Sequence, residues 1–334
     1  MKRGAKGLKR VLSGMRPTGP LHLGHLVGAL KNWAGLQDKY ECLFMVADWH
    51  AHMSEYDKGH KDLGRYTLDN VADWLSCGLD PKKSTLFVQS RIAEHNQLHL
   101  IFSNITPLGW LERCPTYKEQ LREIQTRDLH TYGFLGYPVL QAADILIYKA
   151  DFVPVGQDQL AHLELTREIA RRFEHIYKQA IFPQPQALLT QTPRLLGLDR
   201  RKMSKSYNNF IALSDSAQEV DKKTAQMITD PQRIKKTEPG HPKVCNVFSY
   251  FKTFAPQKEQ EVYRYCTGAE VGCTECKKRL AGILNEILNP IREKKAGLIK
   301  HKSTIEDILA EGAKKAGRIA SQTMDDAKKL IGLY

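Results

Sequence analysis

Two histidines near the start of the chain have the spacing of a phosphate-binding turn. His22 and His25 are three residues apart, so both imidazoles would face the same side of a helical turn. Glycines and prolines between Ser13 and Pro20 break a short apolar strand, Leu8 to Leu12, and apolar residues recur at helical spacing from Leu21. A helix beginning there would offer free backbone N–H groups and two imidazole donors to nucleotide phosphates. An ordinary strand-to-helix connection with surface histidines has the same spacing, so this stretch alone does not decide between the two.

A second stretch, Asp199 to Ser206, is a cationic loop with two serines and one methionine among its lysines and arginines. Alone, it could be a solvated charged surface. Together with the first stretch it resembles the paired signatures of class I aminoacyl-tRNA synthetases, in which an H-x-G-H segment and a K-M-S-K-S loop hold ATP from two sides. The resemblance implies four catalytic residues, namely His22, His25, Lys202 and Lys205.

The composition indicates a folded, basic protein. Of 334 residues, 42% are hydrophobic and 26% are charged, which is the balance of a globular protein and not of a disordered or membrane one. There are 50 Lys and Arg against 37 Asp and Glu, and the net charge of +13 favours polyanionic partners such as nucleic acid. The chain shows no signal-peptide pattern and no apolar run of about 18 residues. We therefore expect a cytoplasmic protein that makes no membrane contact.

The order of apolar segments predicts an α/β fold, a doubly wound parallel sheet of the Rossmann-like nucleotide-binding type. Cys42 to Ala47 is the kind of apolar run that forms a strand buried on both faces, a helical pattern follows over 63–77, and Ser84 to Gln89 predicts another strand. Residues 92–136 have the pattern of a helical insertion. We expect residues 1–208 to form the catalytic domain and residues 209–334 to form an all-α C-terminal domain.

The predicted helix from Tyr137 to Tyr148 carries an unusual polar stripe. Tyr137, Gln141 and Asp144 lie at i, i+4 and i+7, so they share one face. Because a buried carboxylate without a partner is costly, Asp144 needs either a ligand or polar neighbours at a domain seam, and the helix alone does not separate these alternatives.

The segment after this helix extends the resemblance. Phe152 to Val155 predicts a short strand, and it leads into Gly156-Gln157-Asp158-Gln159. The helix and this turn together look like the amino-acid pocket and ribose-binding turn of tryptophanyl-tRNA synthetases. The resemblance implies that Asp144 accepts the indole N–H, that Tyr137, Gln141 and Gln159 hold the amino end, and that Asp158 with Gly156 binds the ribose and adenine side of ATP.

The same resemblance assigns the nucleotide site and the reaction. The implied ATP-binding residues are Arg16, Pro17, Thr18, Gly24, His25, Gly156, Gln157, Asp158, Leu195, Lys202, Met203, Ser204, Lys205 and Ser206. ATP with Mg²⁺ and L-tryptophan would form tryptophanyl-adenylate, and a homodimeric enzyme would transfer the acyl group to tRNA(Trp). The sequence departs from better-known bacterial members at Gln141 and Arg16, and at Gln120, where a second phosphate-binding lysine is expected. The alternatives are a tyrosine-tRNA ligase and a non-catalytic RNA-binding paralogue.

Four of the seven cysteines form a cluster that predicts a metal site. Cys245, Cys266, Cys273 and Cys276 follow the spacing C-x20-C-x6-C-x2-C, whereas Cys42, Cys77 and Cys114 lie scattered in apolar surroundings. Four thiolates suit tetrahedral zinc or a 4Fe-4S cluster, and spacing alone does not separate them. Some members of the family carry a 4Fe-4S cluster on a similar spacing, so the resemblance favours iron and sulfur over a structural zinc.

The C-terminal region is predicted to contact RNA. Between Lys277 and Lys302 there are eight Lys or Arg against two Glu, a charge balance that suits the phosphate backbone of RNA. A solvated helix face would have the same composition. The resemblance implies a tRNA anticodon-binding domain.

Overall fold

A five-stranded parallel sheet forms the centre of the N-terminal half. The computed structural model describes residues 7–56, 62–123, 129–189, 195–205 and 207–333. The strands lie in the order β3-β2-β1-β4-β5, and each pairs with its neighbours in parallel. Their bounds are β1 Arg10–Met15, β2 Glu41–Val46, β3 Ser84–Val88, β4 Phe152–Val155 and β5 Gln186–Leu189. The prediction of a doubly wound α/β fold is confirmed.

Helices cover both faces of this sheet, and buried apolar side chains form one cluster on each side. After β1 come α1 Leu23–His25, the π-helical turn η1 Leu26–Leu30 and α2 Lys31–Leu36. The other helices of this half are α3 Asp48–Glu55, α4 Leu63–Ser76, η2 Gln89–Arg91, α5 Glu94–Ile105, α6 Leu108–Glu112, α7 Pro115–Glu123, α8 Tyr132–Ile147, η3 Gln157–Gln159 and α9 Leu160–Tyr177.

Helix α8 begins five residues before the Tyr137 start that the sequence predicts. Thr131 is its N-cap, and its side chain accepts a hydrogen bond from the backbone N–H of Phe134 at 3.2 Å. Pro138 therefore lies inside the helix and not at its start. Thr131 provides the start signal because its side chain satisfies one of the free N–H groups at the helix N-terminus.

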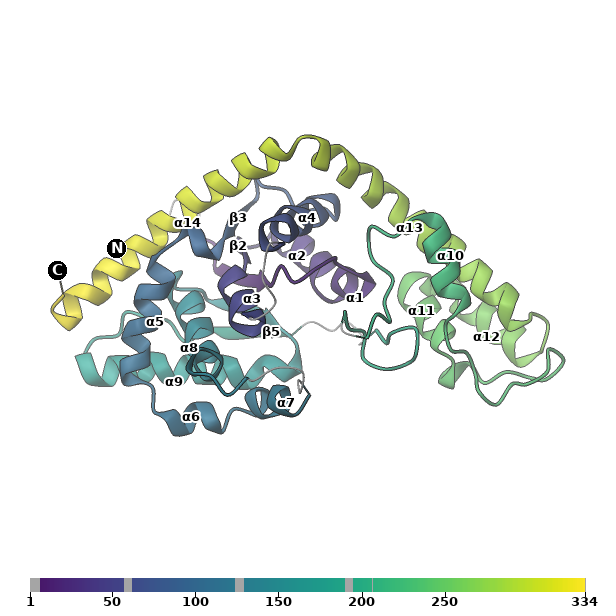
Figure 1. The fold of residues 1–334 in the computed structure, drawn as a ribbon, viewed down its shortest axis with the longest axis horizontal. Helices are drawn as coiled ribbons and strands as arrows, with labels where there is room; N and C mark the ends of the chain where they lie inside the picture. The colour runs from purple at the N-terminus through teal and green to yellow at the C-terminus, as the bar shows by residue number, and fades with distance from the viewer. Residues whose placement is uncertain (1–6, 57–61, 124–128, 190–194, 206, 334) are drawn as a thin grey trace.

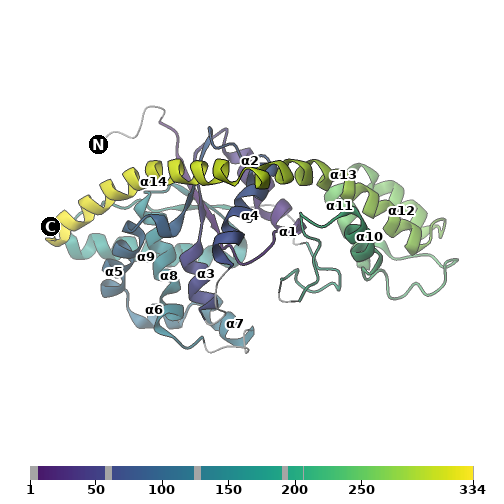
Figure 2. The same ribbon diagram turned by 45° about the horizontal axis from the view of Figure 1, so that its top comes forward.

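The C-terminal part is helical, as the sequence predicts. It contains α10 Ala217–Ala225, η4 Pro242–Val244, α11 Asn246–Phe254, η5 Pro256–Lys258, α12 Glu259–Thr267, α13 Cys273–Lys300 and α14 Lys302–Ile331. Figure 1 and Figure 2 show α13 and α14 as a long arch: α10, α11 and α12 lie beneath α13, and the sheet domain lies beneath α14. No helix in the described part of the chain is long and apolar enough to cross a membrane.

Helix α14 covers the edge of the sheet. Strand β3 is an edge strand, and α14 packs directly against it. Gly312 makes this contact so tight that a Cβ on it would lie 1.7 Å from the carbonyl oxygen of Leu86. An uncovered edge strand is a template for aggregation, so the last helix of the chain protects a strand that lies more than 200 residues earlier in sequence.

Candidate active site

The two motif stretches meet in space. Lys205 Nζ donates to the carbonyl oxygen of Gly19 at 3.1 Å, and a Cβ on Gly24 would lie 3.2 Å from Met203 Sδ. The segment after the cationic loop also pairs with the start of the first helix: Leu23 N–H donates to the carbonyl of Ile211 at 3.1 Å, and His22 forms an isolated antiparallel bridge with Ala212. The loop is therefore held against the histidine turn by main-chain pairing as well as by the Lys205 side chain.

The expectation that the first helix offers free backbone N–H groups to a phosphate is wrong. Gly24 N–H donates to His22 Nδ1 at 3.1 Å, and His22 N–H donates to His25 Nδ1 at 3.1 Å. The N–H groups of His25 and Leu26 are paired with the His22 carbonyl. The turn satisfies its own donors because each imidazole folds back as a cap.

This capping, together with burial, determines the protonation state of the two imidazoles and which ring nitrogen carries the proton. Burial, with the nearby charge of Lys205, lowers the pKa of His22 to about 3. Burial also lowers the pKa of His25 well below its usual value, and His22 and Lys205 act in the same direction. Both rings are therefore neutral, and because each Nδ1 accepts, each proton must be on Nε2. Two Nε2–H donors on rings whose centroids are 3.8 Å apart are left for an anion.

Asn209, which the sequence analysis did not single out, braces the cationic loop. Its Oδ1 accepts from Ser204 N–H at 2.9 Å, and its Nδ2 donates to Asp199 Oδ1 at 2.7 Å and to the Lys202 carbonyl at 3.1 Å. A Cβ on Gly197 would lie 2.2 Å from Asn209 Nδ2, so only glycine fits there. The sequence signal that could have identified Asn209 is its position: it is a polar residue directly before the apolar run Phe210 to Leu213.

Asp144, which the sequence predicts at the amino-acid end of the site, is 2% exposed. Its carboxylate accepts from His95 Nδ1 at 2.6 Å, from His50 Nε2 at 2.9 Å, and from Gln89 Nε2 at 2.8 and 2.9 Å. Burial opposes its ionisation, but the charge of His95 and the hydrogen bonds from His50 and His95 lower the pKa of Asp144 to about 2. Polar neighbours therefore satisfy this carboxylate, and sequence reasoning missed all three of them.

Tyr137 lies in a second polar chain. Its hydroxyl is 3.0 Å from His162 Nε2, and His162 Nδ1 is 3.4 Å from Cys114 Sγ. Cys114 is buried, as expected for a core residue, and its thiol also contacts a histidine.

The remaining predicted residues follow strand ends. Gly156 is the N-cap residue of η3, and a Cβ on it would lie 2.7 Å from Asp158 Oδ1. Gln159 Nε2 donates to Asp158 Oδ2 at 3.2 Å. Arg16 Nη1 donates to Ser54 Oγ at 3.3 Å. Leu195 is buried in the same apolar cluster as Met203. Pro17, Thr18 and Gln157 lie in the turns after β1 and β4, Gln141 is partly exposed on α8, and Ser206 lies outside the described residues.

These residues come together because parallel strands end at one edge of the sheet. Arg16 follows β1, His50 lies in the helix after β2, Gln89 follows β3, and Asp158 follows β4. The strand order reverses between β1 and β4, which is where ligands bind in open α/β sheets.

The four clustered cysteines lie far along the chain, in the helical part. Cys245 precedes α11, Cys266 is in α12, and Cys273 and Cys276 are in the first turn of α13. Burial raises the pKa of Cys276 to about 11, and the thiols of the other three act in the same direction. The four thiols are thus neighbours. Within the described ranges, no three His, Cys, Asp or Glu side chains form a group that could hold a metal ion.

Comparison with known proteins agrees with this geometry. Residues 6–289 match the family model of tRNA synthetases class I (W and Y). The tryptophan–tRNA ligase of Thermotoga maritima is 49% identical over 97% of this chain and 99% of that protein, and the one of Aquifex aeolicus is 43% identical over 97% and 100%. A crystal structure of tryptophanyl-tRNA synthetase from Campylobacter jejuni, complexed with ADP and tryptophan, has a TM-score of 0.87 at 34% identity and covers 97% of this chain and 100% of that one. The chain therefore belongs to the class I tRNA synthetases, in the family of the tryptophanyl-tRNA synthetases.

Proposed function

We propose that this chain is a tryptophan-tRNA ligase. The observation that carries the proposal is the meeting of the histidine turn with Lys205, in a chain 49% identical to a tryptophan–tRNA ligase over nearly its full length. The carboxylate of tryptophan attacks the α-phosphorus of ATP, pyrophosphate leaves, and the adenylate forms. A hydroxyl of tRNA(Trp) then attacks the acyl carbon, and AMP leaves.

The residues would act by position and charge, since no covalent enzyme intermediate is needed. The Nε2–H groups of His22 and His25 would donate to phosphate oxygens, and Lys202 and Lys205 would offset the charge that builds as pyrophosphate leaves. Mg²⁺ would enter with ATP, because magnesium at such sites is bound largely through substrate phosphates. The turn with Gly156, Gln157 and Asp158 would hold the ribose.

Asp144 would select the amino acid. The ionised carboxylate can only accept, so it favours a side chain that carries an N–H or O–H donor. The Gln89 amide nitrogen donates to both carboxylate oxygens of Asp144. An indole N–H could therefore replace Gln89 as the donor to one of these oxygens while Gln89 keeps its bond to the other. Tyr137, Gln141 and Gln159 would surround the amino end.

Amino-acid-dependent exchange of pyrophosphate into ATP tests this function. We expect tryptophan to drive exchange, tyrosine to drive little, and phenylalanine, which has no donor, almost none. Asp144→Asn keeps the shape but removes the charge, so tryptophan-dependent exchange should fall about 10- to 100-fold while ATP binding is retained. Faster exchange with tyrosine would identify a tyrosine-tRNA ligase, and no exchange with any amino acid would identify a non-catalytic paralogue.

We also propose a 4Fe-4S cluster on Cys245, Cys266, Cys273 and Cys276. Two observations support this proposal: the four thiols are neighbours, and the backbone N–H groups of Val247 and Phe248 donate to Cys245. The cluster would be structural, because the reaction has no redox step.

Metal analysis after anaerobic purification tests the cluster. We expect about four irons per chain and a brown chromophore, lost in Cys273→Ser and kept in Cys77→Ser. Loss of the cluster should weaken tRNA charging more than pyrophosphate exchange. One zinc ion per chain would refute the iron-sulfur cluster. Equal loss of tRNA charging and of pyrophosphate exchange would refute a role of the cluster that is confined to tRNA charging.

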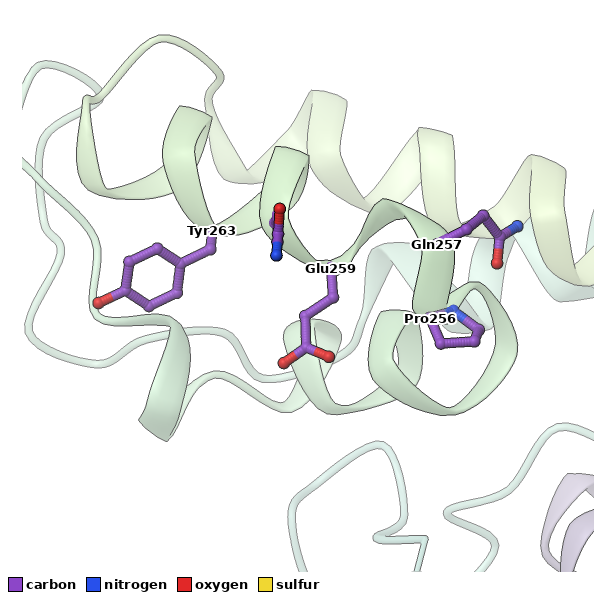
Figure 3. Close-up of a pocket in the computed structure, with 5 residues that line it drawn as sticks. Pro256, Gln257, Glu259 and Tyr263 are labelled. Atoms are coloured by element: carbon purple, nitrogen blue, oxygen red, sulfur yellow. The ribbon is translucent and has the colours of Figure 1, made fainter.

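The helical part from residue 209 is proposed as the anticodon-binding domain. It has a hollow of about 720 Å³ lined by Pro256, Gln257, Glu259, Gln260 and Tyr263, whose side chains come from η5 and α12 (Figure 3). Tyr263 is 44% exposed and could stack on an unpaired base, while the two carboxamides could read its edge.

Substitution of Tyr263 tests this surface. Tyr263→Ala should raise the KM for tRNA about five-fold or more, because a base loses its stacking partner. Tyr263→Phe keeps the ring and should behave like the unaltered protein, and pyrophosphate exchange should be the same in all three. An unchanged KM for tRNA in Tyr263→Ala would exclude the hollow from RNA binding.

A homodimer is proposed on the basis of exposed apolar side chains on α5, α6 and α8. Leu100, Leu108 and Tyr132 are 64%, 61% and 72% exposed. Where such side chains gather into one contiguous patch, the surface is typical of protein contacts. Light scattering should give twice the chain mass.

A cytoplasmic location is proposed from the state of the thiols. None of the seven cysteines forms a disulfide, as is usual in proteins of a reducing compartment. Cell fractionation tests this.

A further inference from the structure

Three side chains from three separate helical segments form a line that ends at the amino-acid site. Cys114 Sγ is 3.4 Å from His162 Nδ1, and His162 Nε2 is 3.0 Å from the Tyr137 hydroxyl. Cys114 stands just before α7 and is 6% exposed, His162 is in the first turn of α9 and is 1% exposed, and Tyr137 on α8 is partly exposed. Of the three side chains, only Tyr137 is therefore exposed enough to contact a ligand.

The protonation of His162 limits how this line can be arranged. Burial, with a contribution from His50, lowers the pKa of His162 to about 4, so the ring is neutral and carries one N–H and one acceptor nitrogen. The proton is then either on Nδ1, donated to Cys114 Sγ, or on Nε2, donated to the Tyr137 oxygen.

The two arrangements give Tyr137 opposite characters. If Nδ1–H donates to the cysteine sulfur, Nε2 accepts the tyrosine O–H, and both lone pairs of the phenol oxygen stay available to a ligand. If Nε2–H donates to the phenol oxygen instead, one lone pair is taken and the O–H points away from His162 as a donor. An amino-acid ammonium has three donors and no acceptor, so the first arrangement, which leaves both lone pairs available, suits it better than the second.

We propose that Cys114 and His162 are positioning residues that set the Tyr137 hydroxyl as a hydrogen-bond acceptor for the ammonium group of the amino-acid substrate. This inference rests on the proposed function, in which Tyr137 lies at the amino end of tryptophan. Cys114 belongs to the helical insertion, so the position of the insertion bears directly on substrate affinity. Neither residue touches the substrate.

The kinetic test compares variants of each member of the line. Cys114→Ala and His162→Leu should raise the KM for tryptophan about three- to ten-fold, the value of one net hydrogen bond, with kcat and the KM for ATP within about two-fold of the unaltered protein. Cys114→Ser keeps an acceptor, and His162→Gln keeps an acceptor near Nε2, so both should rescue much of the loss. Cys77→Ala removes a half-buried thiol outside the line and is the matched control.

A ligand without the ammonium group separates positioning from general damage. Indole-3-propionate has the ring and the carboxylate of tryptophan but no amine, so as a competitive inhibitor it should bind the His162→Leu variant as well as the unaltered protein. In a Tyr137→Phe background, His162→Leu should add no further loss, because both changes remove the same interaction.

The outcomes distinguish this inference from the function on which it rests. Equal weakening of tryptophan and indole-3-propionate, or a loss confined to kcat, would overturn the positioning role. So would a raised KM in Tyr137→Phe alongside an unchanged KM in His162→Leu. An unchanged KM in Tyr137→Phe would instead remove Tyr137 from the proposed amino-acid site, and the inference would fall with it.

Discussion

Lys205→Ala is expected to slow adenylate formation by at least about 100-fold, the scale on which enzymes lose rate when one charge-stabilising donor is removed. Lys205 Nζ reaches the carbonyl of Gly19, and its charge is felt at both His22 and His25. In the proposed function, the phosphates of ATP lie beside this ammonium. The charge it offsets appears as pyrophosphate leaves, so tryptophan affinity should change little.

Single-turnover measurement of adenylate formation checks this expectation. Lys222→Ala is the matched control, since it removes the same charge from an exposed position on α10. Its rate should stay within about two-fold of the unaltered protein, because exposed charges at a distance are screened by salt. A normal rate in Lys205→Ala would remove the cationic loop from the chemical step.

Gly312→Ala is expected to destabilise the protein by about 3 kcal/mol or more, a large effect for one methyl group. The new Cβ would lie 1.7 Å from the Leu86 carbonyl oxygen, which belongs to the backbone of β3 and cannot rotate away. Helix α14 would have to lift from the sheet, and the β3 edge would lose its cover.

Urea denaturation measures this loss, and Gly317→Ala is a control on the same helix. A Cβ on Gly317 meets nothing within 4 Å, so that change should stabilise the helix by up to about 1 kcal/mol through propensity alone. If both substitutions changed the free energy of unfolding equally, the close approach of Gly312 to β3 would make no contribution to stability. Aggregation of Gly312→Ala on mild heating would agree with exposure of the edge.

The sequence by itself determined the order of elements and the two motif stretches. Strand β2 and helix α4 lie within one or two residues of their predicted ends, because apolar runs and helical periodicity are local signals that neighbouring residues set together. The H-x-G-H turn and the cationic loop are also local patterns. Their residue types alone predict phosphate binding.

Only the tertiary structure decided which side chains of the site contact one another. The partners of Asp144 come from 49, 55 and 94 residues away, and the Lys205 contact to Gly19 spans 186 residues. The imidazole tautomers depend on a cap geometry that the helical pattern does not specify, and Gly312 looks like any other helix glycine until β3 is beside it. Local periodicity records which residues are buried, but not which distant segment buries them, because that depends on how the whole chain packs.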